Sequence, residues 1–332
     1  MNSGPGPGPG PKNGAPVTSK LIPKGGTRLA AFLPVAGLFA VVPLHFNSLF
    51  LCSITILFIT WLSTFKVLML AFDNGPLYYP SQHSLFKFLA VGCLPVEFKS
   101  RDGNERCRTK GTNSFAKNGF KVALLAMLLA GCGYGDRMDP KVVLTMYFLV
   151  IYFSLEILLA VGAATWRGLV GVELEPVLNE PYLSASLQEF WGRRWNLIMA
   201  RMFHSAVYVP TRDFSAAIVG RRWAAQPAAV VTFGVSGLMH ELSFFYFGCV
   251  EPRWEVTRFF LLHGVCVAVE IGVKKELKLR RRFPAVAGVV LTHGFLLATA
   301  FWLFFPQFLW CICKHRGVGS DCLERSVFVR FF

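Results

Sequence analysis

Charged residues are scarce in this sequence. They make up 16% of its 332 residues, whereas hydrophobic residues make up 54%. A soluble domain of ordinary composition carries about 25% charged residues, so the sequence excludes a fully water-exposed surface. We also expect no secretory signal peptide, because no basic segment in the first residues leads directly into a short cleavable apolar core. The composition therefore predicts an integral membrane protein.

The motifs of several soluble enzyme classes are absent as well. Nine cysteines are present but scattered, without the paired Cys-x-x-Cys spacing of zinc sites or the density of a small secreted domain. His240 is followed by Glu but not by a second His at the spacing of a zinc protease, so we expect no metal site. No Gly-x-Ser-x-Gly motif presents a serine nucleophile, which argues against a covalent acyl-enzyme.

Apolar runs dominate what is present. At about 20 residues per span they predict about seven transmembrane helices. The runs cover residues 29–46, 49–72, 120–132, 142–166, 228–247, 257–273 and 284–305. A further apolar stretch, 85–96, is too brief to span and is expected in the interface or as a re-entrant segment. The fold class is therefore all-α: a polytopic membrane protein with about seven transmembrane helices plus re-entrant or interfacial amphipathic helices.

The formal charge of +15 is distributed in short blocks between these runs. Three basic loops, within 97–121, 167–226 and 274–282, are separated from one another by two predicted spans each. All three therefore lie on one face, which the positive-inside rule assigns to the cytosol. Seven spans then leave the N-terminus cytosolic and the tail luminal. This distribution argues against nucleic-acid binding.

Four regions follow along the chain. Residues 1–28 are rich in Gly and Pro and are expected to be disordered, because they cannot bury apolar surface. Residues 29–170 hold the N-terminal transmembrane helices. Residues 171–257 carry the candidate catalytic motifs, and residues 258–332 hold the C-terminal transmembrane helices and tail.

His240 is the residue that the surrounding sequence explains least. An ionisable ring inside an apolar run is costly and is a functional-site hypothesis by default. Ser236 and Ser243 share its helix face and could hydrogen-bond it, or could simply pack between helices. Glu241 points about 100 degrees away, so we expect it to serve another polar group. His263, Glu270 and His293 form either part of the same cavity or a structural hydrogen-bond network, the second being favoured.

An amphipathic segment precedes that run, over residues 180–203. Pro181 suits a first turn, Ser184 is a possible helix cap, and Glu189 and Arg193 are spaced as an i,i+4 pair. The indoles of Trp191 and Trp195 suit the boundary between water and lipid. The segment is therefore either an interfacial anchor or a polar helix that faces His240.

Two motifs in this arrangement resemble the plant wax synthase family, a branch of the membrane-bound O-acyltransferases. They are Pro181-Tyr-Leu-Ser-Ala-Ser-Leu-Gln-Glu-Phe-Trp-Gly-Arg-Arg-Trp-Asn196 and Ser236-Gly-Leu-Met-His-Glu-Leu242. The similarity continues through residues 22–25, 61–66, 72–76, 263–270 and 301–306. Members of that family carry one more hydrophobic helix ahead of the segment that matches 22–25, where this chain has its Gly/Pro repeats.

The resemblance implies that His240 and Asn196 are the catalytic residues. A neutral imidazole, which burial favours, can take the proton of a hydroxyl as it attacks a thioester. Asn196 can donate its amide N–H to the developing oxyanion. The substrate-binding residues would be Trp191, Arg193, Arg194 and Trp195. The two arginines could bind the phosphates of coenzyme A, or could be topological charge alone.

The resulting expectation is an acyl-CoA-dependent O-acyltransferase of the endoplasmic reticulum membrane that esterifies a long-chain fatty alcohol. It would use acyl-CoA as co-substrate and need no other cofactor, and its partners would be acyl-CoA, a lipid alcohol and membrane lipids. A sterol or diacylglycerol acceptor is the alternative within the same chemistry. A polytopic lipid transporter or an inactive scaffold is the non-enzyme alternative, although the sequence lacks the internal repeat common in transporters.

Overall fold

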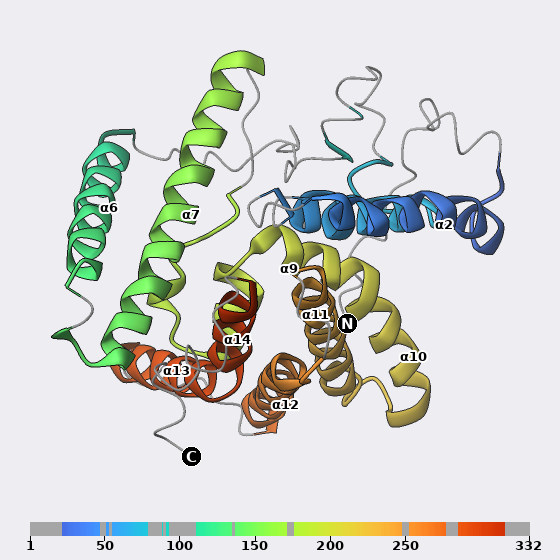
Figure 1. The fold of residues 1–332 in the computed structure, drawn as a ribbon. Helices are drawn as coiled ribbons and strands as arrows, with labels where there is room; N and C mark the ends of the chain where they lie inside the picture. Colours follow the sequence, from blue (N-terminus) through green and yellow to red (C-terminus); the bar gives the residue numbers. More distant parts are fainter. Residues whose placement is uncertain are drawn as a thin grey trace.

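All the elements that the structure describes are helices. A computed structural model describes residues 22–46, 51–52, 55–78, 88, 91–92, 111–134, 137–170, 176–247, 252–276 and 285–315. Figure 1 shows these elements as coiled ribbons. Within the described ranges they are α-helices, π-helices and short 3-10 helices. The predicted all-α class is confirmed. The expected disorder of residues 1–21 and most of the short apolar stretch 85–96 lie outside the described residues.

Five described helices are long and apolar enough to cross a membrane. They are Gly26–His45, Lys141–Val161, Ala225–Tyr246, Glu255–Glu276 and Val286–Phe308. The remaining two predicted runs are also helical, but their apolar parts, Ile56–Leu70 and Asn118–Cys132, are shorter. A polytopic membrane protein is thereby confirmed. The side of the membrane on which each loop lies stays a prediction.

The N-terminal helices are α2 (Gly26–Val41), the 3-10 turn η1 (Val42–His45), the π-helix η2 (Ile56–Ser63) and α4 (Thr64–Leu70). Arg28 is 1% exposed and joins α2 to the end of α4. Its guanidinium lies 2.5 Å from the carboxylate of Asp73 and donates to the carbonyls of Ile22 and Leu70. Helix α2 thus begins at Gly26, inside the segment 1–28 that was expected to be disordered. The buried ion pair of Arg28 orders the last residues of that segment.

Helices α6 (Gly111–Cys132) and α7 (Pro140–Val170) pack side by side at one edge of the molecule (Figure 1). Lys121 of α6 and Glu156 of α7 form an ion pair between them. Both side chains are largely buried, and two opposite charges tolerate an apolar setting far better together than apart. The pair therefore fixes which faces of the two helices meet.

Helices α11 (Ala225–Tyr246) and α12 (Glu255–Glu276) form the central pair. Glycines let their backbones approach: a Cβ on Gly237 would lie 3.0 Å from the Cα of Thr257, and one on Gly264 would lie 2.7 Å from the Cβ of Phe233. Small residues at a helix contact are the usual solution in membranes. Next come α13 (Ala285–Thr299), the π-helix η7 (Ala300–Phe304) and α14 (Phe305–His315).

The segment ahead of α11 is a series of short helices. They are η4 (Pro181–Leu183), α8 (Leu187–Glu189), the π-helix η5 (Phe190–Arg194), α9 (Leu197–Phe203), the π-helix η6 (His204–Tyr208) and α10 (Val209–Val219). The predicted continuous amphipathic helix is therefore wrong. Its cap is Ser186, whose hydroxyl oxygen accepts the Glu189 N–H at 3.2 Å, whereas the Ser184 hydroxyl donates to the carbonyl of Pro181.

The ion pair of this segment also differs from the prediction. Glu189 pairs with Arg194, five residues on, with its Oε1 2.8 Å from Nε of the guanidinium, and not with Arg193. The cause is the π-helical turn, in which the N–H of Trp195 donates to the carbonyl of Phe190 at 2.8 Å. A π turn brings residue i+5 over residue i, where an α turn would bring i+4.

Candidate active site

A cavity of about 1120 Å³ lies among these helices. Five of the six predicted site residues line it: Trp191, Arg193, Trp195, Asn196 and His240. Along α11 its lining runs from Ala229 to Phe247, a separation of 18 residues. At 1.5 Å per residue this is about 27 Å, close to the roughly 30 Å of a bilayer's hydrocarbon core. The cavity therefore extends through most of the depth that the helix spans.

The ring of His240 is held in one tautomer. Its Nδ1 lies 2.7 Å from the carbonyl oxygen of Ser236. A carbonyl only accepts, so Nδ1 carries the proton and Nε2 keeps a lone pair. The ring also stacks on Phe260, with centroids 4.3 Å apart and planes at 29°. His240 thus offers Nε2 as a base in a fixed orientation.

The serine hydroxyls near His240 have other partners. Ser243 accepts the indole N–H of Trp61 at 3.0 Å and donates to the carbonyl of Met239 at 2.9 Å. At Ser236 it is the backbone carbonyl that bonds His240. The prediction that the hydroxyls of Ser236 and Ser243 hydrogen-bond His240 is therefore not what the structure shows.

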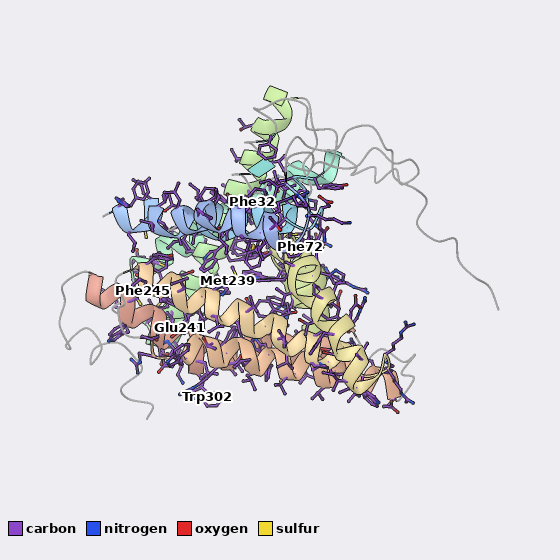
Figure 2. All side chains as sticks on the ribbon, turned by 90° about the vertical axis from the view of Figure 1, so that its right-hand side faces the viewer. Phe32, Phe72, Met239, Glu241, Phe245 and Trp302 are labelled. Carbon is purple, nitrogen blue, oxygen red and sulfur yellow. The ribbon has the colours of Figure 1, made fainter. Side chains whose placement is uncertain are left out.

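Glu241 serves another group, as predicted. One of its carboxylate oxygens accepts the backbone N–H of Trp254 at 2.7 Å, at the start of α12. Figure 2 shows Glu241 on the side of α11 toward α12, with Met239 on the opposite side. The carboxylate thus connects α11 to the residue just ahead of α12, and it does not orient His240.

Asn196 combines two properties in one side chain. Its backbone is left-handed, with φ of 41°, a conformation that Asn tolerates better than most residues. Its Oδ1 accepts the N–H of Met199 at 3.4 Å and so caps α9. The amide oxygen of Asn196 accepts the capping hydrogen bond, so its amide N–H groups remain available as donors. Asn196 also lines the cavity.

The two tryptophans pack inside the bundle. Trp195 stacks between Phe190 and Tyr152, at centroid distances of 5.5 and 6.1 Å. Trp191 contacts Phe233 and Phe260 at 5.7 and 5.8 Å. Both rings line the cavity. Their packing is that of a cavity wall, which favours a segment that faces His240, as a series of short helices, over an interfacial anchor.

The two arginines have different surroundings. The guanidinium of Arg194 bonds Glu189 and the carbonyl of Glu180, and the cavity lining does not include it. Burial tends to raise the pKa of the Glu189 carboxyl, but the backbone N–H of Ala185 and the Arg194 guanidinium together hold that pKa below its ordinary value. Arg193 is exposed and lines the cavity. Of these two arginines, Arg193 is therefore the one placed to meet a ligand in the cavity.

Backbone distortion marks the site more clearly than any side chain. All four π-helices in the described ranges contribute to the cavity lining: η2 through Trp61, η5 through Trp191, η6 through His204 and η7 through Phe304. π turns are rare and concentrate at functional sites. The sequence pattern did not single out Trp61, Tyr152 or His204. Trp61 at least lies in a motif that the resemblance covers, residues 61–66.

The other membrane histidines lie in separate arrangements. His263 is fully buried, and its Nε2 lies 3.0 Å from the hydroxyl of Thr299. His293 lines the cavity and bonds the carbonyls of Val289 and Pro181. Glu270 accepts the N–H of Gln188 and pairs with a lysine of its own helix. His263, Glu270 and His293 therefore make structural hydrogen bonds, which was the favoured prediction, but these bonds do not join into one network.

The fold and site define a multi-span membrane protein in which one cavity joins an oriented imidazole to an amide donor. Residues 174–262 match the profile of the "Membrane bound O-acyl transferase family". The chain is 42% identical to "Acyl-CoA--sterol O-acyltransferase 1" of Arabidopsis thaliana, over 92% of this chain and 91% of that protein. It is 40% identical to the "Long-chain-alcohol O-fatty-acyltransferase" of Simmondsia chinensis, over 86% and 82%, and 40% identical to "Probable long-chain-alcohol O-fatty-acyltransferase 1" of Arabidopsis thaliana, over 92% and 89%.

The chain therefore belongs to the membrane-bound O-acyltransferase family, in its wax synthase branch. The resemblance predicted from the two motifs is confirmed, and so is the class of enzyme, an O-acyltransferase.

Proposed function

We propose that this protein moves a fatty acyl group from acyl-CoA to the hydroxyl of a long-chain alcohol, in the membrane of the endoplasmic reticulum. The observation that carries the proposal is the shared cavity: His240 with Nε2 unprotonated, and Asn196 with its amide N–H groups unspent on the helix cap, line the same space. A base and an oxyanion donor are what this transfer requires.

The chemical step uses each group once. Nε2 of His240 takes the proton of the alcohol as its oxygen forms a bond to the thioester carbonyl carbon. The carbonyl oxygen becomes an oxyanion, to which Asn196 donates. When the carbonyl re-forms, the C–S bond breaks and the imidazolium returns its proton to the departing thiolate. The products are the ester and free coenzyme A, and the enzyme is regenerated without a covalent intermediate.

The cavity lining suits these substrates. It is mostly apolar and aromatic, and it runs along α11 for about 27 Å, which fits long hydrocarbon chains. The exposed Arg193 lies on the predicted cytosolic side, where it would meet a phosphate of coenzyme A. Arg194, engaged by Glu189, would hold the shape of the turn that carries Arg193 and Trp195.

A sterol acceptor is the second candidate. It is favoured by the 42% identity with a relative whose name describes a sterol O-acyltransferase, which is slightly higher than the 40% found for two proteins named for long-chain alcohols. The proposed base, donor and transfer step are the same for both acceptors.

The test is ester formation in microsomes of a yeast strain that lacks its own neutral-lipid acyltransferases. Labelled palmitoyl-CoA is supplied with hexadecanol, ergosterol or diacylglycerol in separate reactions, and the esters are separated by thin-layer chromatography. We expect wax ester from hexadecanol at the highest kcat/KM. A higher value with ergosterol would overturn the proposed acceptor, and no ester from any of the three would overturn the proposed function.

A matched pair of variants assigns the base. His240→Gln should lower kcat by about 10²- to 10⁴-fold, the usual contribution of a general base. His45→Gln is the control, because the Nδ1 of His45 also bonds the carbonyl four residues earlier, at 3.2 Å, yet His45 is exposed and does not line the cavity. It should keep full activity. If His240→Gln keeps more than about a tenth of the rate, His240 is not the base.

A further inference from the structure

His263 and Trp191 are two buried polar rings in contact. Their centroids are 5.6 Å apart, with planes at 48°. Trp191 lines the cavity, but its indole nitrogen is buried, so the N–H points into the protein and not toward a ligand. Among the described residues this N–H has no acceptor, and Nδ1 of His263 has no donor.

The protonation of His263 follows from its other bond. The hydroxyl of Thr299 donates to the carbonyl of Phe295 at 2.8 Å, so its oxygen can only accept from Nε2 of His263, at 3.0 Å. Nε2 therefore carries the proton and Nδ1 carries a lone pair. The remaining ring neighbours of His263, Phe259 and Phe295, offer no side-chain donor.

A buried donor and a buried acceptor, each without another partner, lie on adjoining rings. Leaving either unsatisfied is destabilising, and native structures rarely do so. We propose that His263 is a positioning residue whose Nδ1 accepts the Trp191 N–H through one buried water, and so fixes the indole as a wall of the acyl cavity. Trp191 touches Phe260, on whose face His240 stacks. The proposal rests on the proposed function, because the wall matters only if the cavity holds the acyl chain.

Two amide substitutions tell the nitrogens of His263 apart. Asn carries its amide about where Nδ1 lies, so the oxygen of His263→Asn can accept from Trp191. Gln carries its amide one bond farther, about where Nε2 lies, and can serve only Thr299. With palmitoyl-CoA and hexadecanol, His263→Asn should stay within about threefold of the original kcat/KM, whereas His263→Gln and His263→Leu should lose about tenfold. Activity kept by Gln and lost by Asn would overturn the proposal.

A double-variant cycle tests the pairing itself. Trp191→Phe removes the N–H, so His263→Leu added to it should change kcat/KM by less than about twofold. The control is Trp195→Phe, another cavity-wall tryptophan whose ring contacts, Phe190 and Tyr152, do not include His263; its loss should multiply with that of His263→Leu. Multiplying losses for Trp191 and His263 would overturn the pairing.

The same variants separate this inference from the proposed function. If the unaltered protein forms no ester from any acceptor, the function fails, and the thermal unfolding midpoints in detergent decide the pairing alone. Trp191→Phe and His263→Leu should then each lower the midpoint, and the double variant should lower it no further than the larger single effect. Additive losses in the midpoint would overturn the pairing.

Discussion

Asn196→Asp separates the two roles that the structure assigns to this side chain. The carboxylate keeps an oxygen where Oδ1 accepts the Met199 N–H, and Asp is as good a helix cap as Asn. Asp also tolerates the left-handed backbone at φ 41°. What the substitution removes is the amide N–H, the group proposed to donate to the oxyanion. The variant should therefore fold normally and fail at the chemical step.

The magnitudes of the two effects differ widely. Loss of one oxyanion donor lowers kcat by about 10²- to 10³-fold, and the added negative charge opposes the oxyanion further. Asn196→Ala is the contrasting variant. It loses the cap, at about 0.5–2 kcal/mol, and places in the left-handed region a residue whose side chain cannot hydrogen-bond locally, at about 1–2 kcal/mol. Ala should thus lower stability markedly, whereas Asp should leave it almost unchanged.

The assay measures kcat and KM for palmitoyl-CoA in microsomes at matched protein levels, together with the unfolding midpoint of the purified protein in detergent. For Asn196→Asp we expect a large loss in kcat, little change in KM and little change in the midpoint, because a donor aimed at developing charge acts mainly in the transition state. If this variant keeps more than about a tenth of the original kcat, Asn196 is a helix cap and nothing more.

The arginines and the loops give further tests. Arg193→Ala should raise KM for acyl-CoA severalfold with kcat unchanged, and the effect should shrink at high salt; an unchanged KM would contradict a phosphate contact. Arg194→Ala should instead lower stability, by up to about 1 kcal/mol for a partly exposed pair. Because the pKa of Glu189 is held low, that difference should be present above about pH 4.3 and disappear as the pH falls through the lowered pKa. A glycosylation acceptor inserted near Asp136 should be modified and one near Lys278 should not; modification at Lys278 would refute the topology.

The helices were predictable because apolar length is a strong signal. Each of the seven predicted runs contains described helix, since a chain in hydrocarbon must satisfy its backbone internally. The start of α2 was predicted at residue 29 but lies at Gly26. The sequence pattern does not show that Arg28 pairs with Asp73, which is 45 residues away. Buried charge is recognisable only once its partner is known.

Five of the six residues predicted for the site line the cavity, but their geometry was not predictable. His240 stands out by its apolar surroundings, and the resemblance supplies Asn196, but neither indicates that Asn196 caps α9 or that Ser236 bonds His240 through its carbonyl. Periodicity also failed over residues 180–203, because an α-helical period was assumed where η5 forms a π turn. The turn η5 packs through Trp191 against Phe233 of α11 and Phe260 of α12, and no local sequence pattern reports these contacts.

The π turn of η5 provides a last test of whether backbone distortion shapes the cavity. Deleting Gly192 removes the extra residue, so an α turn can replace the π turn while Arg194 comes to lie four residues from Glu189, where the pair can still form. Residues on either side of the turn then keep their relative direction, but those inside it, Trp191 and Arg193, are redirected, because an α turn holds fewer residues than a π turn. Trp191 and Arg193 should then no longer line the cavity as they do around the π turn.

Ester formation should therefore be lost although the protein still inserts and keeps its ion pair. Gly192→Ala is the matched control. A Cβ at this position meets no atom within 4 Å, and Ala favours a helix more than Gly does, so this variant should retain activity. The measurement is kcat/KM with palmitoyl-CoA and hexadecanol at equal protein levels. Equal values for the deletion and for Gly192→Ala would show that the π turn is dispensable, and that the cavity takes its shape from the regular helices alone.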